Sequence, residues 1–228
     1  MSATIHNSAP SNALLIQQPS SPAQLILLFH GVGSNARSLQ GIGEAVAAAF
    51  PQAMVVAVDA PHSAGMPGAW QWFSVAGVTE DNRQARVDAA MPAFTACVAH
   101  WQQRCGLGPQ ATALIGFSQG AIMSLESTKL AHPPAGRVVA LSGRFATLPA
   151  TGDYGGSVHL MHGKEDPVIS YQHAIAAAHQ MRELGIDFTA EVRPFVGHEV
   201  PPDFVTLLVD RLSTHVSHRV WSEAVQGQ

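Results

Sequence analysis

The chain has 228 residues, of which 46% are hydrophobic and 12% are charged, and its formal net charge is −4. This balance supplies enough apolar material for one large core and excludes an intrinsically disordered chain. Lys and Arg together number 12 against 16 Asp and Glu, with no basic run, which argues against a nucleic-acid-binding surface.

Apolar runs of strand length alternate with helical patterns through the first half of the chain. Residues 1–12 are small and polar and are expected to form a loose or strand-edge extension. After them, strands are predicted at Gln24–Phe29 and Met54–Val58, and helices at Arg37–Phe50 and Asp81–Arg104. Pro92 inside the second helix predicts a kink or a break there.

The second half repeats the same alternation. Strands are predicted at Ala111–Phe117, Arg137–Leu141, Val158–His162 and Asp187–Arg193, and helices at Gln119–His132, Ser170–Leu184 and from Pro201 to about Trp221. Such alternation predicts an α/β protein with a mostly parallel central sheet and helices on both faces. No linker or repeat divides the chain, so we expect one domain over residues 1–228.

A Gly-x-Ser-x-Gly pattern, Gly116–Gly120, joins a predicted buried strand to a predicted helix. This context is typical of a nucleophilic serine raised on a strained turn, with glycines where side chains would collide. Ser118 is therefore the candidate nucleophile. The alternative is a Gly-rich turn that carries an inert serine.

A serine hydroxyl needs a base, and the base needs an orienting acid, in the chain order Ser, acid, His. Asp166 follows a predicted strand and precedes the stiffening Pro167, which makes it the favoured acid. Asp153, in a Gly-rich loop, is the weaker alternative. His198 lies between the last predicted strand and the last predicted helix and is the candidate base.

Negative charge that develops on an acyl oxygen is usually held by two backbone N–H groups. One is the amide after the nucleophile, Gln119. The other is assigned to Val32, in the Gly-rich run His30–Ser34 after the first predicted strand. A nucleotide site is not expected there, because the third glycine and the Gly-Lys-Ser/Thr signature are both missing.

Neither pair of closely spaced histidines is predicted to bind a metal. His159 and His162 point to opposite faces of one strand, and His215 and His218 have no third ligand spaced with them.

Several apolar side chains near the expected sheet edge are candidates for an acyl groove, although each could equally belong to the core. They are Met66, Trp70, Trp72, Phe73, Phe117, Phe145 and Leu148. Only about 16 residues separate Leu141 from Val158, which leaves no room for a helical lid domain. An open, shallow site is therefore expected.

The motifs together resemble the phospholipase/carboxylesterase family, which includes acyl-protein thioesterases and short bacterial carboxylesterases. The matching stretches, which span nearly the whole chain, are His30–Gly33, Asp59–Pro61, Trp70–Phe73, Gly116–Gly120, Leu141–Gly143, His162–Val168 and Gly197–His198. The resemblance implies a compact α/β-hydrolase fold that needs no cofactor and acts on acyl esters or thioesters. Ser34, Ser74 and Arg144 depart from the family pattern, which favours simple esters over long-acyl or protein-linked substrates.

The sequence thus predicts a serine carboxylesterase that hydrolyses short- to medium-chain acyl esters through an acyl-enzyme. One alternative is an acyl-protein or acyl-CoA thioesterase or a lysophospholipase. Another is a catalytically silent hydrolase fold that serves as a binding module. The expected partner is a small acyl ester or thioester, and the sequence leaves open a homodimer.

We expect a cytoplasmic protein without a membrane span. The first eight residues lack the basic stretch of a signal peptide, and Leu14–Ile16 is too short for its apolar core. The two cysteines, Cys97 and Cys105, lie on one predicted helix with Cα atoms roughly 12 Å apart, which is beyond disulfide reach. Two free thiols suit a reducing compartment.

Overall fold

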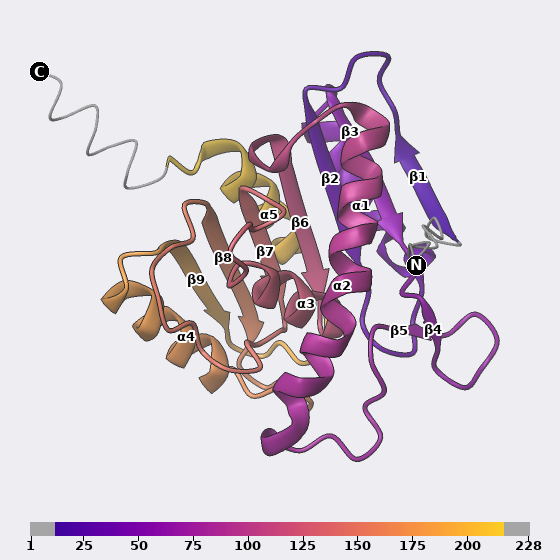
Figure 1. The fold of residues 1–228 in the computed structure, drawn as a ribbon. Coiled ribbons are helices and arrows are strands. Elements are labelled where there is room, and N and C mark those ends of the chain that lie inside the picture. Colours follow the sequence, from indigo (N-terminus) through magenta and orange to yellow (C-terminus); the bar gives the residue numbers. More distant parts are fainter. Residues whose placement is uncertain (1–11, 217–228) are drawn as a thin grey trace, which may run out of the picture.

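The six apolar runs predicted as strands lie side by side in one sheet. The computed structural model describes residues 12–216, and its seven-stranded sheet has the order β1-β3-β2-β6-β7-β8-β9 (Figure 1). The strands are β1 (Ala13–Gln17), β2 (Gln24–Phe29), β3 (Ala53–Val58), β6 (Thr112–Phe117), β7 (Arg137–Leu141), β8 (Ser157–Gly163) and β9 (Asp187–Arg193). All neighbours from β3 to β9 are parallel. The predicted mostly parallel α/β architecture is confirmed.

The seventh strand, β1, was not predicted. It pairs antiparallel with β3 at one edge of the sheet. Only one of its faces is covered, so it lacks the continuous apolar run of the central strands. Its last residue, Gln17, donates side-chain hydrogen bonds to the carbonyls of Phe50 and Ala53, at 2.9 and 2.8 Å. Nearly all of the extension expected to be loose, residues 1–11, lies outside the described residues.

Helices cover both faces of the sheet (Figure 1). The α-helices are α1 (Gln40–Ala49), α2 (Glu80–Cys105), α3 (Gln119–Ser127), α4 (Gln172–Glu183) and α5 (Pro202–Thr214). Successive side chains of the central strands point to opposite faces of the sheet and so contribute to two apolar cores. Leu25, Leu27 and Phe29 of β2 pack with residues of α2, α3 and α4. Ile26 and Leu28 pack on the other face with residues of α1 and α5.

The long helix α2 runs through Pro92 without a break. Pro92 removes one hydrogen bond of the helix. Residues of α2 before and after Pro92 pack in the core and support the helix on both sides of the proline. Phe94 is fully buried and packs at a tilt against Phe29, with ring centroids 4.6 Å apart. Cys97 and Cys105 lie on this helix as free thiols, as predicted.

Two helices end earlier than predicted. α3 ends at Ser127 rather than His132, because the hydroxyls of Ser127 and Thr128 donate to the carbonyls of Ser124 and Leu125 and the chain turns away. α5 ends at Thr214, where His215 adopts an extended backbone, so the predicted continuation to about Trp221 is wrong. Residues from 217 onward, including His218, lie outside the described residues.

Replacing the buried His159 of β8 should reduce the acid sensitivity of the fold. Burial, aided by the nearby His215, lowers the pKa of His159 to about 4, whereas the unfolded side chain titrates near 6.5. As the pH falls, His159 therefore takes up its proton in the unfolded chain before it does so in the folded protein. The stability that the neutral, buried His159 contributes is complete above pH 6.5 and is lost as the pH falls toward 4. Over that range the loss is on the order of 3 kcal/mol.

Urea unfolding of the wild type and His159→Gln at pH 7.5 and pH 4.5 tests this expectation. The free energy of unfolding should fall less between the two pH values in the variant than in the wild type. Equal falls in both proteins would show that His159 does not carry the acid sensitivity assigned to it.

Candidate active site

Ser118 occupies a sharp turn between β6 and α3. Its backbone has φ 53° and ψ −114°, a left-handed conformation that is costly for a residue with a side chain. Its amide donates to the carbonyl of Leu141 at the end of β7, at 2.9 Å. The surrounding structure therefore holds the strained residue at the carboxyl edge of the sheet.

The two flanking glycines make this turn possible. A Cβ on Gly116 would lie 2.4 Å from backbone atoms of Gly120 and Ala121. A Cβ on Gly120 would lie 2.2 Å from the carbonyl oxygen of Phe29 in β2. Contacts this short do not occur for real Cβ atoms, so α3 approaches the sheet closely enough to form the turn only with glycine at both places.

The structure brings Ser118, His198 and Asp166 together from three separate loops. The Nε2 atom of His198 lies 2.9 Å from Ser118 Oγ, and its Nδ1 atom lies 2.7 Å from Asp166 Oδ2. An ionised carboxylate only accepts hydrogen bonds, so Nδ1 carries the proton and Nε2 accepts the Ser118 hydroxyl. This is the geometry in which an imidazole removes a proton from a serine.

The Asp166 carboxylate is fully buried and has hydrogen-bond donors on both oxygens. Its Oδ1 atom accepts the amides of Val168 and Ile169 at 2.8 and 2.9 Å. Burial alone would raise the pKa of Asp166, but the hydrogen bonds from His198, Ile169 and Val168 outweigh it, so the pKa lies below its usual value. The group is therefore ionised near neutral pH and can orient His198.

His162 supplies a further contact to this carboxylate, one that the sequence interpretation missed. Its Nε2 atom lies 2.7 Å from the carbonyl of Ile169 and 3.2 Å from Asp166 Oδ2, so Nε2 carries the proton. Burial lowers the pKa of His162, which keeps the ring neutral. Its position four residues before Asp166, at the end of a buried strand, is the sequence signal that could have indicated this contact.

The loop of residues 30–34 lies directly against the serine. A Cβ on Gly31 would lie 3.1 Å from Ser118 Cβ. Two contacts hold the loop in place: His30 Nε2 accepts the amide of Ala60 at 3.0 Å, and Ser34 pairs with Trp70 of β5 (Trp70–Gln71). Strand β5 forms a short hairpin with β4 (His62–Ser63).

The two amides predicted to hold an oxyanion belong to residues next to this contact: Gln119 follows Ser118, and Val32 follows Gly31. Gln119 begins α3, where first-turn amides have no helical acceptor. Within residues 12–216, the Val32 amide donates to no backbone acceptor. The side chain of Gln119 is used elsewhere: it accepts the amide of Trp72 at 2.7 Å and donates to the carbonyl of Phe73 at 2.8 Å.

The apolar candidates for substrate binding differ in how far they are buried. Three of them, Trp72, Phe73 and Phe145, are buried and pack in the hydrophobic core. The prediction that these three line an open acyl groove is therefore wrong. Trp72, for example, contacts Phe29 and Phe94 edge to face. Met66 is exposed on the hairpin, and Trp70 is half-buried beside Ser34.

Phe117 is the aromatic candidate whose ring contacts His198. Its ring lies 5.0 Å from that of His198, between centroids. Both rings line a hollow between the first turns of α1 and α5.

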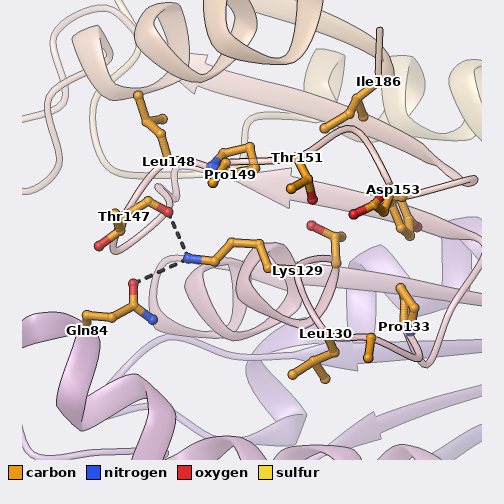
Figure 2. Close-up of a pocket in the computed structure, with 14 residues that line it drawn as sticks. Gln84, Lys129, Leu130, Pro133, Thr147, Leu148, Pro149, Thr151, Asp153 and Ile186 are labelled. Atoms are coloured by element: carbon orange, nitrogen blue, oxygen red, sulfur yellow. Dashed lines mark hydrogen bonds between the residues drawn. The ribbon is translucent and has the colours of Figure 1, made fainter. Parts of the chain in front are cut away.

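A separate cavity of about 590 Å³ lies at the far end of α3, around Lys129 (Figure 2). Lys129 donates to the carbonyl of Thr147 at 2.8 Å and pairs with Glu126 at 2.7 Å. Asp153, the alternative acid, lines this cavity, as does Leu148, a candidate for the acyl groove (Figure 2). The nine residues of α3, about 14 Å of helix, separate them from Ser118.

Arg144, which departs from the family pattern, forms an ion pair with Glu80 at the start of α2. Its Nη1 and Nη2 atoms lie 3.0 and 2.7 Å from the two Glu80 oxygens. Hydrogen bonds from Arg144 and Arg83 lower the pKa of Glu80 to about 2. The Arg144 charge is thus already compensated and is not presented free to a ligand.

Residues 12–216 contain neither a metal-binding cluster nor a helix that could cross a membrane. Among these residues, no group of three or more His, Cys, Asp or Glu side chains is arranged to hold a metal ion. No helix in the same part of the chain combines the length and the apolar character needed to cross a membrane.

The chain is similar in sequence and in fold to known esterases and thioesterases. A family model described as Phospholipase/Carboxylesterase matches residues 11–216. Esterase YpfH of Escherichia coli (strain K12) is 47% identical over 93% of this chain and 92% of its own length. Acyl-protein thioesterase 1 of Kluyveromyces lactis is 26% identical over 72% of this chain and 79% of its own. Among solved structures, esterase PE8 superposes with a TM-score of 0.77 at 29% identity, covering 88% of this chain and 96% of PE8.

Substitution of Gly120 by alanine should severely destabilise the protein. The added methyl group would overlap the Phe29 carbonyl, and because that atom belongs to a central strand, neither side can yield cheaply. We expect a loss of about 3 kcal/mol or more, or failure to accumulate as folded protein.

Gly155→Ala is the matched control, because a Cβ at that position meets no atom within 4 Å. Thermal unfolding of both variants gives the comparison. A Gly120→Ala protein with the melting temperature of the control would refute the close approach of α3 to β2.

Proposed function

Because the chain belongs to the phospholipase/carboxylesterase family and is a hydrolase of esters, we propose that it is a serine carboxylesterase for short- to medium-chain acyl esters. Ser118 is the proposed nucleophile, His198 the base and Asp166 the orienting acid. The observation that carries the proposal is the continuous hydrogen-bonded line from Ser118 Oγ through the His198 imidazole to the buried Asp166 carboxylate, at 2.9 and 2.7 Å.

In the proposed acylation step, His198 Nε2 takes the Ser118 proton as Oγ bonds to the acyl carbon. The carbonyl oxygen becomes negatively charged, and the amides of Val32 and Gln119 donate hydrogen bonds to it. The imidazolium then passes its proton to the leaving alcohol oxygen as the carbon–oxygen bond breaks. Asp166 stays ionised throughout and stabilises the positive charge on the ring.

Deacylation repeats these roles with water. His198 removes a proton from a water molecule that attacks the Ser118 ester, and the same two amides hold the second oxyanion. The proton returns to Ser118 Oγ as the acid departs. The neutral, buried His162 supports Asp166 without competing for the proton.

Short acyl groups are favoured because the aromatic side chains expected to line an acyl groove are in large part buried in the core. The relative named acyl-protein thioesterase makes thioesters the second substrate class to test. The cytoplasmic location stays a prediction, and the free thiols of Cys97 and Cys105 are consistent with it.

Steady-state kinetics with p-nitrophenyl esters of increasing acyl length and matching acyl thioesters test the proposal. The wild type should give its highest kcat/KM on oxygen esters with short to medium acyl chains. Ser118→Ala should lower kcat about 10⁴-fold or more, since it removes the atom that forms the covalent bond. Asp166→Asn should lower kcat by a comparable factor while the protein stays folded.

Thr206→Ala is a suitable control, because Thr206 is exposed on α5 and bonds only within its own helix. Retained hydrolysis in a folded Ser118→Ala variant would end the proposal. A preference for thioesters over oxygen esters of equal chain length would reassign the substrate class and keep the mechanism.

A further inference from the structure

A groove of about 660 Å³ opens beside His198, between the first turn of α1 and the first turn of α5. We call it the α1–α5 groove. Its volume lies within the range of small-molecule sites. It is separate from the Lys129 cavity at the opposite end of α3, with which it shares no lining residue.

The groove begins at the reacting centre. His198 and Phe117 both line it, and their rings are 5.0 Å apart. Ser34, at the end of the loop that carries Val32, lines it as well. A molecule attached to the acyl carbon at Ser118 can therefore extend past the imidazole into the groove without passing through the core.

The chemistry of the proposed reaction decides which half of an ester lies there. His198 must hand its proton to the oxygen of the leaving alcohol, so that oxygen has to lie within hydrogen-bond reach of Nε2. The acyl oxygen, in contrast, faces the Val32 and Gln119 amides. The alcohol is consequently the half of the substrate that lies beside the imidazole, at the mouth of the groove.

The lining of the groove indicates which alcohols fit. Leu39, Ile42, Val200 and Val205 give it an apolar surface that is continuous with Phe117. Among the residues that line the groove, Glu199 carries a charge and His198 can titrate. No Lys or Arg lines the groove. The Glu199 carboxylate repels anionic alcohols such as phosphorylated or carboxylated ones, and no Lys or Arg among the lining residues offsets it.

We propose that the α1–α5 groove binds the alcohol half of the ester and selects neutral alcohols with an apolar or aromatic body. This inference rests on the proposed esterase function and adds its leaving-group specificity.

Gly41 provides a direct test. It lines the groove in the first turn of α1, and a Cβ there would meet no atom within 4 Å. Gly41→Phe therefore begins its side chain in open space and adds bulk to the groove, and phenylalanine suits a helix better than glycine. Gly155→Phe is the matched control, with an equally open Cβ position in a loop that does not line the groove.

The substrates are ethyl butyrate and 2-(2-naphthyl)ethyl butyrate, whose acyl groups are identical and whose alcohols are of similar acidity. Gly41→Phe should lower kcat/KM for the naphthylethyl ester about tenfold or more and for the ethyl ester less than about twofold. The control should change neither value by more than about twofold. Ethyl esters from acetate to octanoate should keep the same chain-length preference in both variants.

A second variant tests the charge. Glu199→Gln should raise kcat/KM for the butyrate ester of glycolate, an anionic alcohol, by about two- to fivefold at low salt, with a smaller change for ethyl butyrate. An altered acyl-length preference in Gly41→Phe would assign the groove to the acyl half and overturn the inference. The inference would also be overturned if folded Gly41→Phe lowered kcat/KM equally for the ethyl and naphthylethyl esters, or changed kcat/KM for neither. If hydrolysis survives Ser118→Ala, the proposed function itself fails, whatever Gly41→Phe shows.

Discussion

The site depends on one steric constraint, the close packing of α3 against the central strands. Gly120 places the start of α3 against the backbone of β2, and Gly116 lets the helix turn back over β6. Ser118 between them is held in a left-handed conformation that it would not adopt in a free chain. The strain is sustained by the fully buried α3, all nine of whose residues lie within the core. The turn also places Ser118 at the carboxyl edge of the sheet, with Gln119 as the first residue of α3.

The remaining groups reach this edge because parallel strands end on the same side. β2 supplies the loop of Val32, β8 supplies Asp166 and β9 leads to His198. Each loop is fastened by specific contacts: His30 with Ala60, and Asp166 with the amides of Val168 and Ile169. The imidazole of His198 is thus positioned by a carboxylate that is itself immobilised. Preorganisation of this kind is what the proposed nucleophilic role of Ser118 requires.

The central parallel strands and the turn that carries Ser118 could be predicted from the sequence. Buried parallel strands read as continuous apolar runs, and the turn chemistry of Gly116–Gly120 is local, so both were recognisable. The edge strand β1 was missed because one covered face leaves little pattern in five residues. Burial of Trp72 and Phe145 could not be distinguished from a groove lining, since the same apolar side chains serve both purposes. The contact of His162 with Asp166 had only the four-residue spacing as a signal, and the groove between α1 and α5 arises from three-dimensional packing that no local pattern encodes.

Covalent labelling tests the central claim, that His198 activates Ser118 for attack. A fluorophosphonate reacts with a serine only when a base makes its hydroxyl nucleophilic. The account predicts one adduct per chain, located at Ser118 by peptide mass mapping, and a labelling rate at least about 10²-fold slower in His198→Ala. A folded protein that stays unlabelled, an adduct on another serine, or an unchanged rate in His198→Ala would contradict it.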